Sequence, residues 1–200
     1  FFQAPGRMNV FNEHPFKVLF DYGHNAHAVS VMADLAQRLD VTGRRIVVLA
    51  GPGDRRDEAL VAIADAVAGR FDPYVCRRAD ALRDRGPDEV PRIQAAALRA
   101  SGVPESAISI IPDEQEAIDA ALRMGRAGDL LLVFADALTR SWKQVMKFCA
   151  TPGHEREVET EAHAVMSAPV ENTYGTGSLA GVEGLVRDER GIRLARETDD

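Results

Sequence analysis

The stretch RIVVLAGPGDRRDE, residues 45–58, decides the fold expected for this chain. Residues 45–50 predict a buried strand, and residues 51–54 predict a glycine-rich turn after it. Apolar residues then recur at helical spacing: Leu60, Ile63, Ala64 and Val67. Asp57 and Glu58 fall in the first helical turn, where they favour the positive end of the helix dipole. A strand, a glycine-rich turn and a helix start present backbone N–H groups to an anionic ligand. The alternative is that the glycines serve only the turn.

Strand and helix patterns alternate throughout residues 1–150. Strands are expected at residues 18–22, 45–50, 72–76, 107–111 and 129–134. Helices are expected at residues 28–39, 57–69, 88–101, 113–124 and 139–148. Strands this apolar, each followed by a helix, predict an α/β fold with a Rossmann-like, mostly parallel sheet covered by helices on both faces.

Residues 151–200 have a different character, because they carry six of the seven net negative charges. The shift in charge near residues 151–153 marks an expected boundary between a domain at 1–150 and an acidic linker and tail at 151–200. Within the tail, residues 182–194 predict a C-terminal appendage with a β-hairpin and Gly191 in its turn.

The composition excludes several classes of protein. The chain is 46% hydrophobic and 28% charged, with a net charge of −7, and has no basic face for nucleic acid. Its apolar runs are too short to span a membrane, and no signal peptide is apparent, so we expect a cytoplasmic protein. Cys76 and Cys149 are expected to be reduced and buried. The chain does not begin with Met, which suggests a piece of a longer protein.

Polar segments follow several predicted strands, at the edge where ligands bind in such sheets. Asp21 could accept hydrogen bonds from ribose hydroxyls, and His24 could meet a phosphate or a reacting carboxylate. The alternative is that Asp21 or Asn25 caps the next helix. Other polar segments at this edge are residues 51–56, residues 77–85 and Asp136.

Three further features bear on phosphate and metal binding. Arg7 could clamp phosphate oxygens, unless it is a surface residue of a linker. His24 and His27 have HxxH spacing, but two ligands do not make a metal site, so none is expected. No GxxxxGK[ST] loop occurs, so a loop that cradles a triphosphate would have to come from elsewhere.

Trp142 is expected in the core.

Five motifs together resemble the C-terminal domain of the Mur-ligase family, and most of all its cyanophycin-synthetase members. In chain order they are PGRM at 5–8, DYGHN at 21–25, GPGDRRDE at 51–58, FAD at 134–136 and RSWKQ at 140–144. The resemblance covers residues 4–148. It implies a ligase that uses ATP to turn a carboxylate into an acyl phosphate, which an amine then displaces. The resemblance to cyanophycin-synthetase members further implies that the ligase adds arginine to the aspartate side chains of a poly-aspartate backbone.

The resemblance also implies roles for individual residues. Arg7 and His24 would be catalytic, and Arg7, Asp21, His24 and Asn25 would bind the nucleotide. Another set would face the incoming amino acid: Gly53, Asp54, Arg55, Asp80, Arg83, Arg85 and Asp136.

The same resemblance implies that the domain works within a longer chain. ATP and magnesium would be required, with the magnesium ligands in a central domain that is missing here. The expected partners are upstream ATPase and ATP-grasp domains, and the protein is expected to be a homo-oligomer. Acyl phosphates hydrolyse in water, so the domain would close over the site, with a hinge at residues 4–6. The isolated chain is therefore expected to be inactive.

One loop departs from the pattern. A lysine and an acidic cluster are expected before Arg-Gly-Arg, yet only Asp80, Arg83 and Arg85 remain. An acidic cluster is what a guanidinium substrate would need. Two alternatives therefore stay open: another Mur-type ligase, of the peptidoglycan-precursor or folylpolyglutamate type, and a non-catalytic interaction domain.

Overall fold

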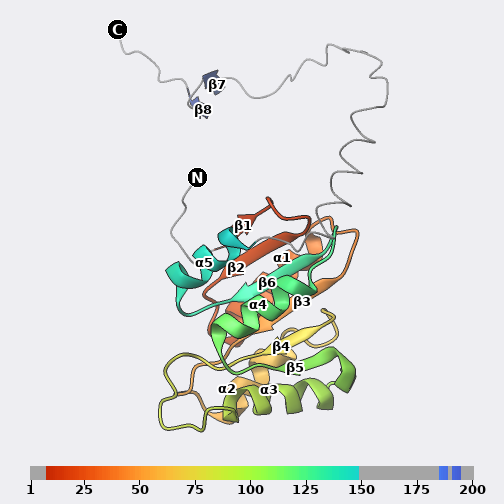
Figure 1. The fold of residues 1–200 in the computed structure, drawn as a ribbon, viewed down its shortest axis with the longest axis vertical. Coiled ribbons are helices and arrows are strands. Elements are labelled where there is room, and N and C mark those ends of the chain that lie inside the picture. Colours follow the sequence, from red (N-terminus) through yellow and green to blue (C-terminus); the bar gives the residue numbers. More distant parts are fainter. Residues whose placement is uncertain (1–7, 149–184, 189–190, 195–200) are drawn as a thin grey trace. The chain divides into compact units, whose positions relative to one another are not determined.

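The computed structural model describes residues 8–148, 185–188 and 191–194, which form two separate units. The larger unit is an α/β domain (Figure 1). Its strands are β1 (Asn9–Phe11), β2 (Lys17–Asp21), β3 (Arg45–Leu49), β4 (Tyr74–Cys76), β5 (Ile108–Ile110) and β6 (Leu130–Phe134). Its helices are α1 (Ala26–Arg38), α2 (Asp57–Asp65), α3 (Glu89–Ala100), α4 (Glu114–Met124) and α5 (Leu138–Lys147), with a 3₁₀ turn at Glu105–Ala107.

The six strands form one sheet in the order β1-β2-β6-β3-β4-β5. Neighbours from β2 to β5 pair in parallel, and only β1 runs antiparallel to its partner β2. The expectation of a mostly parallel sheet is therefore confirmed. β1 was not expected from the sequence, because its three residues are too few to show a strand period.

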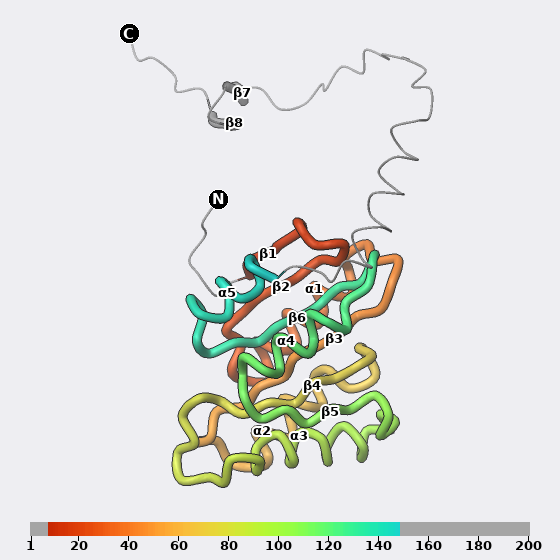
Figure 2. The backbone as a smooth tube through the Cα atoms, in the orientation of Figure 1, coloured from red at the N-terminus to blue at the C-terminus, as the bar shows by residue number. Residues whose placement is uncertain are grey.

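Helices cover both faces of the sheet. Side chains alternate along each strand, so that in β6 Leu132 faces the core under α1, α2 and α3, while Val133 faces the core under α4 and α5. The backbone tube shows α5, the last helix of the described range 8–148, lying beside β1 and β2 from the start of that range (Figure 2). Trp142 of α5 lies edge-on to Phe11 of β1 at 5.9 Å between ring centroids; this tryptophan, expected in the core, is partly buried and packs against it.

Two helix ends show how local chemistry sets the boundaries. α3 ends in a Schellman motif: Gly102 donates to the carbonyl of Arg99, and Val103 to that of Leu98. Gly102 has a φ of +86°, which glycine adopts without strain. The expected helix at 57–69 is too long, because α2 ends at Asp65 and the next residues form turns.

Two further expectations are corrected. Helical spacing predicts that Ala100 faces inward in the helix at 88–101 and Met146 in the helix at 139–148, but Ala100 is exposed and Met146 is 41% exposed. The inward face of α3 is instead formed by Val90, Pro91, Gln94, Ala95, Ala97 and Leu98. The remaining strand and helix limits differ from expectation by one or two residues, as is usual for element ends.

The second unit contains the expected hairpin, with β7 (Leu185–Asp188) antiparallel to β8 (Gly191–Leu194). Gly191 pairs with Asp188 as the first residue of β8, so it is the last residue of the four-residue turn 188–191, where the sequence analysis expected it. The rest of the predicted tail, and Cys149, lie outside the described residues. Cys76 is a buried free thiol, as expected. Within the described residues, no helix has the length and apolar character needed to cross a bilayer.

Candidate substrate site

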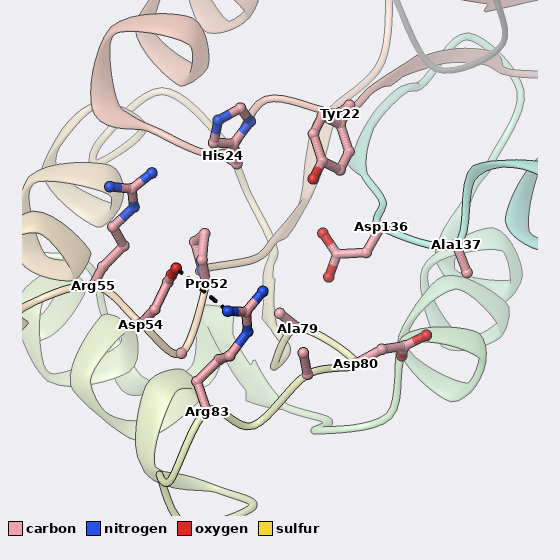
Figure 3. Close-up of a pocket in the computed structure, with 12 residues that line it drawn as sticks. Tyr22, His24, Pro52, Asp54, Arg55, Ala79, Asp80, Arg83, Asp136 and Ala137 are labelled. Carbon is pink, nitrogen blue, oxygen red and sulfur yellow. Dashed lines mark ion pairs between the residues drawn. The ribbon is translucent and has the colours of Figure 1, made fainter.

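A pocket of about 420 Å³ lies at the sheet edge where the parallel strands end (Figure 3). It is lined by Tyr22, His24, Pro52, Gly53, Asp54, Arg55, Ala79, Asp80, Ala81, Arg83, Asp136 and Ala137. Segments that follow four different strands thus meet in one place. Seven residues predicted from the sequence are among them: His24, Gly53, Asp54, Arg55, Asp80, Arg83 and Asp136.

The segment after β2 forms one rim of the pocket. Oδ1 of Asp21 accepts a hydrogen bond from the backbone N of Gly23 at 2.7 Å, and Oδ2 accepts one from that of Met8 at 2.8 Å. A Cβ on Gly23 would come within 2.8 Å of the Phe134 ring. Residue 23 is therefore glycine, because the backbone lies too close to this ring for a side chain. His24 directly follows this tight turn and is part of the pocket lining.

His24 lies against Tyr22, with 5.0 Å between ring centroids. Its Nδ1 is buried and has no hydrogen-bond partner among the described residues. An unpaired buried polar atom is costly and invites a ligand or water. Next to it, Oδ1 of Asn25 accepts from the backbone N of Ala28 and caps α1.

The glycine-rich loop, residues 51–56, packs against the loop after β4. A Cβ on Gly53 would lie 2.2 Å from the carbonyl oxygen of Leu82, closer than any side chain allows. Arg85 then joins the two loops, because its guanidinium donates to the carbonyls of Gly53 at 3.0 Å and Arg55 at 2.6 Å. The same group pairs with Asp57 and Glu89. These contacts raise the pKa of Arg85, the hydrogen bond to Asp57 most strongly.

The loop after β4 is held in an unusual backbone conformation. Arg83 and Asp84 have φ values of +50° and +68°, in the left-handed region that non-glycine residues seldom adopt. Such backbone is concentrated at binding sites. It places the guanidinium of Arg83 in the middle of the pocket, 4.0 Å from the carboxylate of Asp54 (Figure 3).

Asp136 is anchored from below by two buried charges. Arg77 and Glu114 are fully buried and pair at 2.9 Å. Arg77 also donates to Oδ2 of Asp136 at 3.2 Å, while Glu114 accepts from the backbone N–H groups of Asp136 at 2.9 Å and Ala137 at 3.1 Å. The carboxylate of Asp136 points into the pocket (Figure 3).

Every carboxylate of the pocket has an arginine partner. Asp54 pairs with Arg83, Asp80 with Arg140 at 3.2 Å, and Asp136 with Arg77. The first two pairs are half exposed and therefore weak, whereas the Arg77 side chain is inaccessible to solvent. The pocket thus presents acidic groups that differ in how firmly they are held.

Some predicted site residues lie outside the pocket lining. Asp21 and Asn25 are beside it, and their side chains make the backbone hydrogen bonds already described. Arg85 is not among the lining residues, and its guanidinium joins the 51–56 loop to the loop after β4. Arg7 is outside the described residues. In the described part of the chain, no group of three or more His, Cys, Asp or Glu residues could hold a metal ion.

Sequence reasoning missed Arg77 and Glu114. Glu114 follows the helix cap Asp113 and lies in the first turn of α4, where an acidic residue is common because it favours the helix dipole. Residues 77–85 are expected as a polar segment at this edge, but the sequence assigns no role to Arg77 itself. A sequence signal for its role is its position directly after the apolar segment Tyr74–Cys76, since a charged residue there is either exposed or paired.

Comparison with known proteins identifies the family. Residues 6–137 match the family model described as "Mur ligase, glutamate ligase domain". The chain therefore belongs to the Mur ligase family. The chain is also similar to the cyanophycin synthetase of Trichormus variabilis, with 34% identity over 147 residues. That match covers 72% of this chain but 16% of the relative, so the chain spans about one sixth of the length of that protein.

Solved structures share the fold. The chain superimposes on a UDP-N-acetylmuramoyl-L-alanyl-D-glutamate–2,6-diaminopimelate ligase with a TM-score of 0.57 and 20% identity, covering 72% of this chain and 32% of the other. It also matches the folylpolyglutamate synthase of Mycobacterium tuberculosis complexed with ADP and AMPPCP, with a TM-score of 0.52 and 18% identity, covering 74% and 34%.

Proposed function

We propose that the chain is the C-terminal lobe of an ATP-dependent carboxylate–amine ligase of the cyanophycin-synthetase type. The whole protein would add arginine to the carboxylate of a poly-aspartate-type substrate through an acyl phosphate. The observation that carries this proposal is the pocket itself, where segments that follow four strands bring His24, the 51–56 loop, the Asp80–Arg83 loop and Asp136 together. The similarity to cyanophycin synthetase over most of the chain supports the same proposal.

In this proposal the rim after β2 meets the nucleotide. His24 suits such a ligand, because its buried Nδ1 has no hydrogen-bond partner among the described residues. Asp21 would meet the ribose, since each of its oxygens accepts one backbone hydrogen bond and retains a second lone pair. Asn25 would lie beside it, and Arg7 would approach the phosphates. ATP supplies the phosphoryl group, and magnesium would be held by the central domain of the longer protein.

The other walls of the pocket would receive the incoming amino acid. Arg83 in the middle of the pocket suits a carboxylate, because its guanidinium can form two parallel hydrogen bonds. The acidic residues around it suit a positively charged group. Gly53, Asp54, Arg55, Asp80 and Asp136 would line this part, and Arg85 would hold the two loops together.

The longer protein supplies the remaining parts of this proposal. Upstream ATPase and ATP-grasp domains would provide the phosphate-binding loop, and the assembled protein would be a cytoplasmic homo-oligomer. We further propose that residues 1–150 form the functional domain and residues 151–200 a linker and tail. The chain on its own would turn nothing over.

Arginine-dependent release of ADP by the full-length protein tests the proposal. We expect turnover with ATP, magnesium, arginine and a poly-aspartate acceptor. Arg7→Ala and Asp21→Asn should lower kcat/KM about tenfold or more through lost hydrogen bonds to charged groups. Asp119→Asn, on the exposed surface of α4, is the matched control for Asp21→Asn. Unchanged rates in both site variants would contradict the assigned roles.

A second candidate is a Mur-type ligase for a different amino acid. It is favoured by the pairing of every pocket carboxylate with an arginine of the chain, which leaves less negative charge for a guanidinium. An assay with lysine, glutamate and diaminopimelate beside arginine separates the two candidates. If no amino acid supports ADP release, the domain is a non-catalytic interaction module.

A further inference from the structure

We propose that Asp136 is the residue that recognises the guanidinium of the incoming amino acid, and that Arg77 and Glu114 are positioning residues for it. This inference rests on the function proposed above and names the acidic contact that the Asp80–Arg85 loop no longer supplies. It concerns three side chains that are far apart in the sequence and meet under the pocket.

The first argument is one of charge. A single buried arginine beside Asp136 would cancel its negative charge. Glu114 prevents this, because it lies 2.9 Å from Arg77, closer than the 3.2 Å between Arg77 and Asp136. The three side chains together carry one net negative charge, and Asp136 is the member that reaches the pocket. The cluster therefore still attracts a cation.

The second argument is one of rigidity. Arg77 also donates to backbone carbonyls: Nε and Nη2 donate to that of Phe134, and Nη1 to that of Arg78. Glu114 accepts from the backbone of Asp136 and Ala137 and from the hydroxyl of Ser141. The backbone and one carboxylate oxygen of Asp136 are thus held before any ligand arrives, which reduces the entropy lost on binding.

The third argument compares the acidic residues of the pocket. Asp54 and Asp80 have half-exposed side chains, whereas that of Asp136 is 27% exposed and therefore less screened by water. Its Oδ2 is occupied by Arg77, but Oδ1 has no hydrogen-bond donor among the described residues. One oxygen is fixed by Arg77, and the other can accept one charge-assisted hydrogen bond from a guanidinium in the pocket.

The test uses the full-length protein with arginine and with citrulline, which has the same shape but no positive charge. We expect Asp136→Asn to raise the KM for arginine about 10- to 100-fold, through loss of one charged hydrogen bond, and to leave the KM for ATP within about twofold. The variant should also lose most of the preference for arginine over citrulline. Asp119→Asn is the matched control, since Asp119 pairs with Arg123 on α4 outside the pocket lining.

Arg77→Lys tests the positioning role, because lysine keeps the charge but loses the planar fork. We expect the KM for arginine to rise several-fold while kcat changes little. Arg44→Lys is its control: Arg44 pairs with the buried Asp129 at the opposite edge of the sheet, so any general loss of stability would appear there too. If Arg77→Lys does not fold, Asp136→Asn alone decides.

The outcomes separate two kinds of failure. Absence of arginine-dependent turnover in the unmodified protein overturns the proposed function, and the inference with it. Arginine-dependent turnover with an unchanged arginine-to-citrulline ratio in Asp136→Asn overturns the inference alone. An equal rise in KM in Arg77→Lys and Arg44→Lys overturns the positioning role.

Discussion

Individual residues at the pocket are fixed by close contacts that leave little freedom. Gly53 is the clearest case, because a side chain there would collide with the backbone of the neighbouring loop rather than with a flexible group. The charged residues differ, since Asp80 and Arg140 form a half-exposed pair that a substrate can compete with. These two situations lead to predictions of different kinds.

Gly53→Ala should disturb the pocket and the stability of the domain together. Its Cβ would lie 2.2 Å from the Leu82 carbonyl oxygen, so the two loops must separate. We expect the free energy of unfolding, measured with urea, to fall by about 1–3 kcal/mol. Gly86→Ala is the control, because its Cβ would meet nothing nearer than 3.8 Å. Equal effects of the two substitutions would contradict the contact.

Arg140→Gln should change the affinity for the amino acid according to its charge. Arg140 neutralises Asp80 at the pocket, so its removal should lower the KM for arginine by up to about fivefold, the size expected for an exposed ion pair. For an acidic amino acid the same change should raise KM. The exposed Arg123→Gln serves as the control in the same kinetic assay. A rise in the KM for arginine would count against a cationic substrate.

At the scale of elements, the beginning of α4 does more than start a helix. Asp113 caps it by accepting from the backbone N of Gln115 and Glu116. Glu114, one residue later, turns inward to hold the segment between β6 and α5. A helix start on one face of the sheet thereby fixes a loop at the sheet edge.

Glu114→Gln should therefore be strongly destabilising. It removes the charge that compensates buried Arg77, and breaking such a pair costs about 3–5 kcal/mol. Glu116→Gln, an exposed position in the same helical turn, should change the free energy of unfolding by less than about 0.5 kcal/mol. Urea unfolding of both variants measures the difference, and similar losses would show that the buried pair is unimportant.

β4 carries a group whose titration links stability to pH. Burial raises the pKa of the Cys76 thiol from 9.0 to about 12, with a smaller opposing effect of Arg99. The unfolded chain loses this proton first, so the stabilising contribution is present below pH 9 and is lost as the pH rises towards 12. Between pH 9 and 12 we expect the free energy of unfolding to fall by roughly 1 kcal/mol per pH unit. Urea unfolding at pH 8 and 10 measures this. The free energy of unfolding of Cys76→Ala should fall less between the two pH values than that of the unmodified chain, and an equal fall would contradict the prediction.

At the scale of the molecule, the apolar cores found among the described residues lie within 8–148, and the hairpin β7–β8 belongs to a separate compact unit. We therefore expect a chain ending at Phe148 to unfold cooperatively, with a melting temperature within about 2 °C of that of the 200-residue chain. Circular dichroism during heating measures both. A truncated chain that does not melt cooperatively would contradict this division.

How far the sequence predicted the structure depends on how local each feature is. The strand expected at 129–134 and the helices expected at 88–101 and 113–124 rest on the pattern of neighbouring residues, and each lies within one residue of its expected limits. β1 was not predicted, because its three residues are too few to show the alternation of a strand. Seven predicted site residues line the pocket, because parallel strands end at the same edge.

By itself, the sequence determined which segments become strands and helices, and that their polar ends share one edge of a parallel sheet. The tertiary structure decided the order of the strands, with β6 between β2 and β3. That order lets Arg77 reach across the end of β3 to the carbonyl of Phe134, and brings Glu114 beneath Asp136. Periodicity is a property of neighbouring residues, whereas the pairing of distant buried charges depends on packing that no local pattern records.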